Sequence, residues 1–269
     1  MWKRVEKGKV IYYTLPEWSA HGAQVIMSTR AGGVSKAPYD QLNLGLHVGD
    51  ASEAVIANRR LLLAANRWRE EDFVSAQQVH GNRVLYVGAP DRGCGFYDYE
   101  SAIKDTDGLF TAEQGVLIAT FYADCLPLAL FHPTLKLLGL AHAGWQGTYR
   151  NIAAALIGAM QAKHDFDPQE LWAATGAAIG PCCYQVDADF YQRFLKRYSE
   201  AALWFSAAEE GKYYFDNEKA NVALLQQAGV KKENISVLGL CTACHDDLFF
   251  SYRKGAGKTG RHGLWGALI

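Results

Sequence analysis

Three apolar runs close together in the chain constrain the fold most: Val116–Tyr122, Leu126–Phe131 and Leu137–His142. None of them alternates apolar with polar residues, as a strand with one solvent-facing side would. Continuous runs of this length are typical of strands that are buried on both faces, with other elements packed over them. The last two runs are separated only by the short segment His132–Lys136, which predicts a hairpin.

Helical and strand patterns alternate along the rest of the chain. We expect helices at Ser52–Asn66, Thr148–His164, Asp187–Tyr198 and Asn217–Ala228, and further strands at Gln24–Ser28, Arg83–Val87, Leu171–Ile179 and Ile235–Leu240. Residues 28–50 are rich in Gly, Asn and Asp and indicate a long ordered loop. The pattern predicts an α/β (α+β) fold, a single layered domain over residues 1–269 with mixed β-sheets covered by helices.

Composition excludes several classes of function. The chain has 269 residues and a net charge of −1, which gives no reason to expect nucleic acid or an acidic membrane as a partner. The longest apolar region, Val116–Leu130, is interrupted by Asp124 and Pro127 and does not predict a membrane span. The first residues lack the apolar stretch of a signal peptide, so we expect a cytoplasmic protein whose cysteines bind metal, react or pack rather than form disulfides.

Two histidines and a cysteine predict a metal site. His80 follows Gln78-Val79, Cys125 lies between two predicted strands, and His142 ends the strand that returns beside them. Two imidazoles and a thiolate suit Zn²⁺, and a site with three protein ligands leaves a position for water or substrate. Zinc lowers the pKa of bound water to about 7, which is useful to an enzyme at neutral pH. The alternative is a pair of packed histidines and a buried cysteine.

The order of short motifs resembles the YfiH/YlmD laccase-domain family, also called the polyphenol oxidase or multicopper oxidase-like family. The matching segments are Ser28–Val34, Asn43–Asp50, Gln78–Gly81, Asp105–Leu109, Ala123–Pro127, Ala141–Trp145, Ile179–Tyr184, Phe249–Arg253 and Thr259–Arg261. They extend over almost the whole chain. A single one would be a weak signal, but their number and order make the resemblance specific.

The resemblance implies a layered α/β fold and a zinc ion bound by His80, Cys125 and His142. It also implies purine nucleoside chemistry. This comprises phosphorolysis of adenosine, inosine, guanosine and methylthioadenosine, with phosphate as the second substrate, and deamination of adenosine. Some members carry the label of a peptidoglycan editing factor, and older names invoke copper and polyphenol oxidation.

The resemblance and the long loop suggest further site residues. We expect Arg30 to contact phosphate, because its planar fork suits oxyanions, and His47 to bind or protonate the purine or ribose. Asn43 is a candidate for the purine edge. The alternative for all three is hydrogen bonding that only orders the loop. Many relatives have a basic residue where this chain has Gln146, and Arg150 lies one helical turn further on.

Two aspartates near the predicted ligands could orient a ligating imidazole. For Asp107 the sequence favours ordinary capping of backbone amides, and for Asp124 it leaves both roles open.

Cys241–His245 forms a C-x-x-C-H motif like that of c-type haem attachment, but no export signal accompanies it. The adjacent pair Cys182-Cys183 looks poorly suited to complete a second zinc site. The family resemblance places Cys241-Thr242 just before the Phe249–Arg253 motif, which implies a structural role for Cys241–His245.

Three other functions remain open at this point. A copper polyphenol oxidase would fit a ligand set of one Cys and two His, although the chain has no His-x-His pair for a copper cluster and no obvious axial Met. A metal-free cysteine hydrolase would use Cys125 as nucleophile and His142 or His80 as base. A non-catalytic protein would bind zinc without turning over a substrate.

Overall fold

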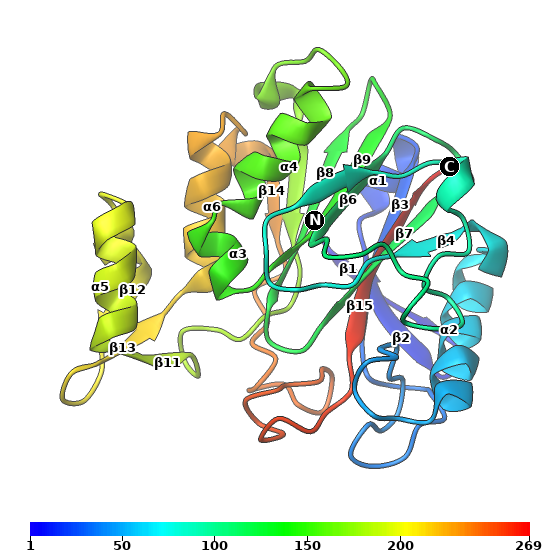
Figure 1. Cartoon of the computed structure of the whole chain (residues 1–269), viewed down its shortest axis with the longest axis horizontal. Helices are drawn as coiled ribbons and strands as arrows, with labels where there is room; N and C mark the ends of the chain where they lie inside the picture. Colours follow the sequence, from blue (N-terminus) through cyan, green and yellow to red (C-terminus); the bar gives the residue numbers. More distant parts are fainter.

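The computed structural model describes all residues 1–269 and has four layers. Two large sheets pack face to face, and helices cover their outer faces (Figure 1). The first sheet has the strand order β1 (Lys3–Lys7), β2 (Val10–Thr14), β3 (Ala23–Ser28), β15 (His262–Leu268), β7 (Leu117–Tyr122) and β4 (Phe73–Ser75). The second has the order β14 (Ile235–Val237), β10 (Trp172–Thr175), β8 (Leu126–His132), β9 (Leu137–Ala143), β6 (Gly108–Thr111) and β5 (Val84–Tyr86).

Six α-helices accompany the sheets. They are α1 (Pro16–Ala20), α2 (Ser52–Asn66), α3 (Trp145–Tyr149), α4 (Ile152–Gln161), α5 (Ala188–Arg197) and α6 (Asn217–Gln227). A small third sheet with the order β11 (Gln185–Asp187), β13 (Lys212–Phe215) and β12 (Phe205–Ala207) lies with α5 beside the main layers (Figure 1). None of the helices is both long and apolar enough to cross a membrane.

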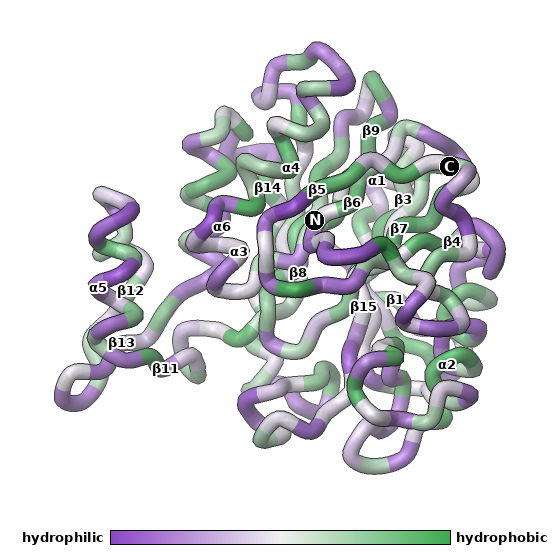
Figure 2. Tube along the Cα trace, viewed as in Figure 1, coloured by the Kyte–Doolittle hydropathy of each residue, from purple (hydrophilic) through white to green (hydrophobic).

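Strands of both large sheets are buried on both faces, as their sequence predicts. Val25 and Met27 of β3 enter the core between the sheets, whereas Ile26 faces the cluster that includes Leu62 and Leu63 of α2. In the second sheet the outer face packs against α4 and α6. Figure 2 shows the corresponding pattern, with apolar residues frequent in the strands and hydrophilic residues at the peripheral loops.

The mixed α/β class is confirmed, and so is the hairpin. β8 and β9 pair antiparallel from Leu126 opposite Ala143 to His132 opposite Leu137. The helix predicted at 148–164 is wrong in detail, because the chain forms α3 and then α4. Asn151 separates them in the left-handed conformation (φ 57°), and its side chain accepts a hydrogen bond from the Ala154 amide.

Other differences concern the strands. The strand predicted at Leu171–Ile179 ends at Thr175, and the one predicted at Ile235–Leu240 ends at Val237. The prediction missed the helix α1 and the strands β1, β2, β4, β6, β11, β12, β13 and β15. Of these, β15 lies inside the first sheet between β3 and β7. Residues 29–51 form no helix or strand, in agreement with the long loop expected there.

Candidate active site

Three separate elements bring together the predicted metal ligands. His80 lies in the loop between β4 and β5, Cys125 in the turn between β7 and β8, and His142 in β9. One ligand atom from each lies within 4.8 Å of the other two. The β8–β9 register explains part of this arrangement, because His142 pairs with Pro127, two residues after Cys125. The structure therefore assembles the His-Cys-His set that the sequence predicts.

Asp107 fixes the side chain of His142 and the backbone of the loop that carries His80. Its carboxylate accepts a hydrogen bond from Nδ1 of His142 at 2.8 Å. It also accepts from the amides of His80 and Gly81, at 3.0 and 2.7 Å. With Nδ1 occupied, Nε2 of His142 is the nitrogen left for a ligand. Asp107 thus caps backbone amides, as the sequence favours, and in addition orients a ligating imidazole.

Asp124 has a different role. Its carboxylate accepts hydrogen bonds from Thr242 Oγ1 at 2.6 Å and from the Arg253 amide at 2.7 Å. Asp124 adopts a left-handed conformation (φ 86°) directly before Cys125, and His80 is also left-handed (φ 61°). Such conformations are costly for these residues and are often found at functional sites. Asp124 therefore connects the Cys125 turn to the C-terminal loops and contacts neither imidazole.

The thiol and the imidazoles change each other's proton affinity. Burial opposes ionisation of Cys125, but the neighbouring His142 and His80 outweigh it and lower its pKa to about 6. Burial likewise disfavours a charged His142, but the Cys125 thiolate and Asp107 raise its pKa to about 9. Cys125 is therefore poised as a thiolate at neutral pH, the form that binds metals and acts as a nucleophile.

A cavity of about 480 Å³ opens beside these ligands. This volume is in the range of small-molecule sites. Its lining includes His47, Gln146, Trp145, Tyr184, Tyr252, Arg253 and Arg261 in addition to the three ligands. A larger depression of about 780 Å³ beside α2 contains no histidine or cysteine.

Two of the residues expected to bind substrate lie outside this cavity. Arg30 donates to the carbonyls of Asp40 and Asp246, both at 2.7 Å, and lines a separate depression. Asn43 is fully buried, and its Oδ1 accepts from the Arg261 amide at 2.8 Å. Arg150 donates to the His80 carbonyl at 3.0 Å and does not line the cavity.

His47 and Gln146 do line it. His47 is solvent-exposed at the cavity, yet nearby protein atoms partly desolvate its imidazole. This desolvation, together with the positive charge of Arg261, lowers the pKa of His47 to about 4. His47 is therefore neutral at physiological pH and able to donate one hydrogen bond and accept another.

The cavity also contains two arginines to which sequence reasoning gave no role. Arg261 uses Nη1 to donate to the carbonyls of Thr259 and Gly260, and the other two nitrogens of its guanidinium group have no hydrogen-bond partner in the protein. Arg253 is exposed and contacts the carbonyls of Cys183 and Gln185. Both residues end motifs that carry the family resemblance, Phe249–Arg253 and Thr259–Arg261. Their position in these motifs is the feature of the sequence that could have indicated a functional role for both arginines.

Comparison with known proteins agrees with the motif resemblance. Residues 24–267 match the family described as multi-copper polyphenol oxidoreductase laccase. The chain is 41% identical to the purine nucleoside phosphorylase YlmD of Geobacillus stearothermophilus, over 89% of this chain and 88% of that protein. It is 37% identical to the purine nucleoside phosphorylase YlmD of Bacillus subtilis, over 87% and 84%.

Solved structures show the same fold. The crystal structure of the hypothetical protein YfiH from Bacillus licheniformis superposes with a TM-score of 0.94 at 34% identity, covering 100% of this chain and 99% of that one. The structure of YlmD from Geobacillus stearothermophilus gives 0.93 at 37% identity, covering 98% of each chain. The chain therefore belongs to the laccase-like family described as multi-copper polyphenol oxidoreductase laccase, and within it is similar to the YfiH and YlmD proteins.

Proposed function

We propose that residues 1–269 act as one catalytic domain, a zinc-dependent purine nucleoside phosphorylase that accepts adenosine, inosine, guanosine and methylthioadenosine. The observation that carries this proposal is the open His80–Cys125–His142 set at a cavity that also contains two arginines. The names of the YlmD relatives point to the same reaction. Both substrates are then small molecules, a purine nucleoside and phosphate.

The donor set fits a zinc ion. With bonds of about 2.0–2.1 Å to nitrogen and about 2.3 Å to sulfur, a tetrahedral zinc separates two nitrogen donors and one sulfur donor by about 3.3–3.6 Å. The three side-chain donors already lie within 4.8 Å of one another, so small rotations suffice. Zinc would supply a positive charge and an open position where the pKa of a bound water falls, which also supports deamination of adenosine as a second activity. Copper would accept the same donors, and elemental analysis distinguishes the two metals.

Phosphate is proposed to bind Arg253 and Arg261. Both guanidinium groups line the cavity, and Arg261 has free donors. These residues take over the role that the sequence suggested for Arg30, whose guanidinium is engaged by Asp40 and Asp246. A guanidinium that clamps an oxyanion fixes its position for attack on the anomeric carbon of the ribose.

The nucleoside is proposed to lie against the aromatic side chains of the cavity, Trp145, Tyr184 and Tyr252. Such rings offer flat apolar surfaces for a purine. His47, neutral because of its lowered pKa, is proposed to hydrogen-bond the purine or ribose rather than to carry a positive charge. Cys125 is proposed to act in catalysis as the thiolate ligand.

The direct test is incubation of zinc-loaded protein with adenosine, with and without phosphate. Phosphorolysis yields adenine and ribose 1-phosphate only when phosphate is present, whereas deamination yields inosine in both cases. Arg253→Gln should raise the KM for phosphate about tenfold, the loss of one charge-assisted hydrogen bond. Lys258→Gln, a nearby exposed lysine outside the cavity, is the matched control. Absence of turnover with all purine nucleosides would reject the proposal.

A metal-free cysteine hydrolase is the second candidate. The lowered pKa of Cys125 and the raised pKa of His142 describe a thiolate–imidazolium pair like that of a cysteine nucleophile and its base. Removal of metal separates the candidates, because a metal-free hydrolase keeps its activity in chelator and the proposed phosphorylase loses it. Alkylation of Cys125 abolishes both activities and cannot serve as the test.

A further inference from the structure

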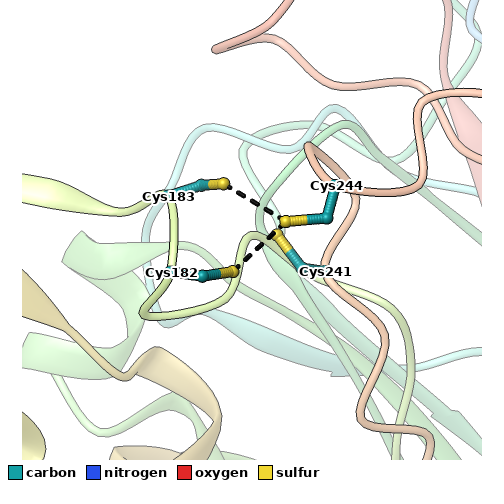
Figure 3. Close-up of side chains that lie close together, drawn as sticks. All are labelled: Cys182, Cys183, Cys241 and Cys244. Carbon is teal, nitrogen blue, oxygen red and sulfur yellow. Dashed lines mark hydrogen bonds between the residues drawn. The ribbon is translucent and has the colours of Figure 1, made fainter.

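Four cysteines outside the active site form a second cluster. Cys182 and Cys183 lie on the loop before β11, and Cys241 and Cys244 lie on the loop after β14. Their sulfur atoms all lie within 4.8 Å of one another, and all four point into the space between the two loops (Figure 3). The two pairs come together because β10 and β14 are parallel neighbours. The segments that follow them remain side by side, with Ala178 bridged to Cys241.

We infer that Cys182, Cys183, Cys241 and Cys244 form a closed, structural Zn²⁺ site, separate from the His-Cys-His site. From the sequence alone, the adjacent residues Cys182 and Cys183 look poorly suited to bind one ion together. The structure shows how both reach the cluster: Cys182 Sγ lies 3.4 Å and Cys183 Sγ 3.5 Å from Cys244 Sγ. A tetrahedral zinc with Zn–S bonds of about 2.3 Å separates its sulfurs by about 3.8 Å, close to these values.

The surroundings favour a metal-bound thiolate over four free thiols. The Gly180 amide donates to Cys241 Sγ at 3.2 Å. Several thiolates at this spacing repel one another, and a divalent cation between them removes that repulsion.

The site has a structural consequence for the cavity. Ile179 and Tyr184, which flank the first cysteine pair, both line the cavity. Thr242, between the other two cysteines, donates to Asp124 beside Cys125. A zinc ion bound here joins the loop before β11, which carries Cys182 and Cys183, to the loop after β14, which carries Cys241 and Cys244. Through Thr242 this second loop also supports the turn that contains Cys125. This inference stands whether or not the proposed purine chemistry is correct.

Metal content tests the inference. Protein purified under reducing conditions and loaded with Zn²⁺ should retain, after desalting, one more zinc per chain than the double variant Cys241→Ser/Cys244→Ser. Cys94→Ser, which removes a cysteine outside both clusters, should retain as much as the wild type. In Cys125→Ser, where the first site lacks its thiolate, the zinc of the cluster should remain. Equal zinc content in the wild type and the double variant would overturn the inference.

A second measurement covers the case in which the double variant does not fold. In the zinc-loaded wild type, the four cluster thiols should be protected from a thiol reagent and become reactive on addition of a strong chelator. Co²⁺ replacing Zn²⁺ should give the intense absorption of a tetrahedral four-thiolate site. Reaction of the four cluster thiols before chelation, disulfides in the intact mass, or iron in place of zinc would each contradict the inference.

Discussion

The carboxylate of Asp107 lies 2.8 Å from Nδ1 of His142 and connects two of the three proposed ligands of the active site. Its second oxygen accepts from the amides of Val79 and Gly81, on either side of His80. One buried carboxylate thus determines the tautomer of His142 and the backbone conformation of the loop that carries His80. Burial opposes its charge, but the bond from His142 and these amides outweigh burial and keep the pKa of Asp107 low. Asp107 therefore stays ionised.

Asp107→Asn should weaken zinc binding about 10- to 100-fold, the usual cost of losing the partner of a ligating histidine. The amide removes the negative charge that stabilises His142 and offers one acceptor oxygen in place of two. Competition with a chromogenic chelator measures the affinity. Asp105→Asn makes the same chemical change at an exposed residue with no side-chain hydrogen bond, and it should leave zinc binding unchanged. Equal affinities for the two variants would refute this role of Asp107.

The proposed metal site, and not the backbone conformation of Gly144, requires a glycine at this position. Its φ of −63° is accessible to any residue, but a Cβ here would lie 2.9 Å from Cys125 Sγ and 3.0 Å from His80 Cδ2. Gly144→Ala should therefore displace a ligand and reduce both zinc retention and kcat at least tenfold. Circular dichroism should show an unchanged fold.

Gly158→Ala is the matched control for Gly144→Ala. It lies inside α4 with nothing within 4 Å of the added Cβ. It should leave activity unchanged and stabilise the protein by about 0.5–1 kcal/mol in denaturant unfolding. Full activity of Gly144→Ala would show that the site tolerates the added methyl group.

Gln146 tests how the cavity holds phosphate. It lines the cavity in the first turn of α3, and its side chain makes no hydrogen bond in the protein. Gln146→Arg adds a cation to the wall of the cavity, so the KM for phosphate should fall several-fold while the KM for the nucleoside changes little. Gln227→Arg makes the same change at the exposed end of α6 and should alter neither constant. An unchanged KM for phosphate in Gln146→Arg would place the phosphate elsewhere.

The sequence predicts the elements that are apolar and continuous and misses those that are short or interrupted by glycine. β8 and β9 are evident because each apolar run has its neighbour close in the chain. β15 is not, because Gly263 and Gly266 interrupt its pattern. These glycines serve close packing, since a Cβ on Gly263 would lie 2.5 Å from Trp265 Nε1.

The same distinction applies to the sites. Motif resemblance predicts His80, Cys125 and His142, but not the Asp107 contacts that orient them or the position of Arg30 outside the cavity. The cysteine cluster joins residues 62 positions apart in the chain through the β10–β14 pairing, which no local pattern reveals.

Glu218 should make stability depend on pH. It lies in the first turn of α6, and burial raises its pKa from 4.5 to about 7, although Thr175 Oγ1 donates to it at 2.8 Å. Because the folded state holds this proton more tightly than the unfolded chain, its contribution to stability is fully present below pH 4.5 and is lost as the pH rises to about 7. Because Glu218 is partly exposed, we reduce the effect expected from the pKa shift, and the free energy of unfolding should fall by about 2 kcal/mol over this pH range.

Glu218→Gln removes this titration, because the amide resembles the protonated carboxyl and cannot ionise. The variant should match the wild type near pH 4 and be more stable by about 2 kcal/mol at pH 8, measured by urea unfolding. Glu209→Gln, at an exposed glutamate without side-chain bonds, should follow the wild type at both pH values. A stability difference between wild type and Glu218→Gln that stays constant from pH 4 to pH 8 would mean that the pKa of Glu218 is the same in the folded and unfolded states, so that burial does not raise it.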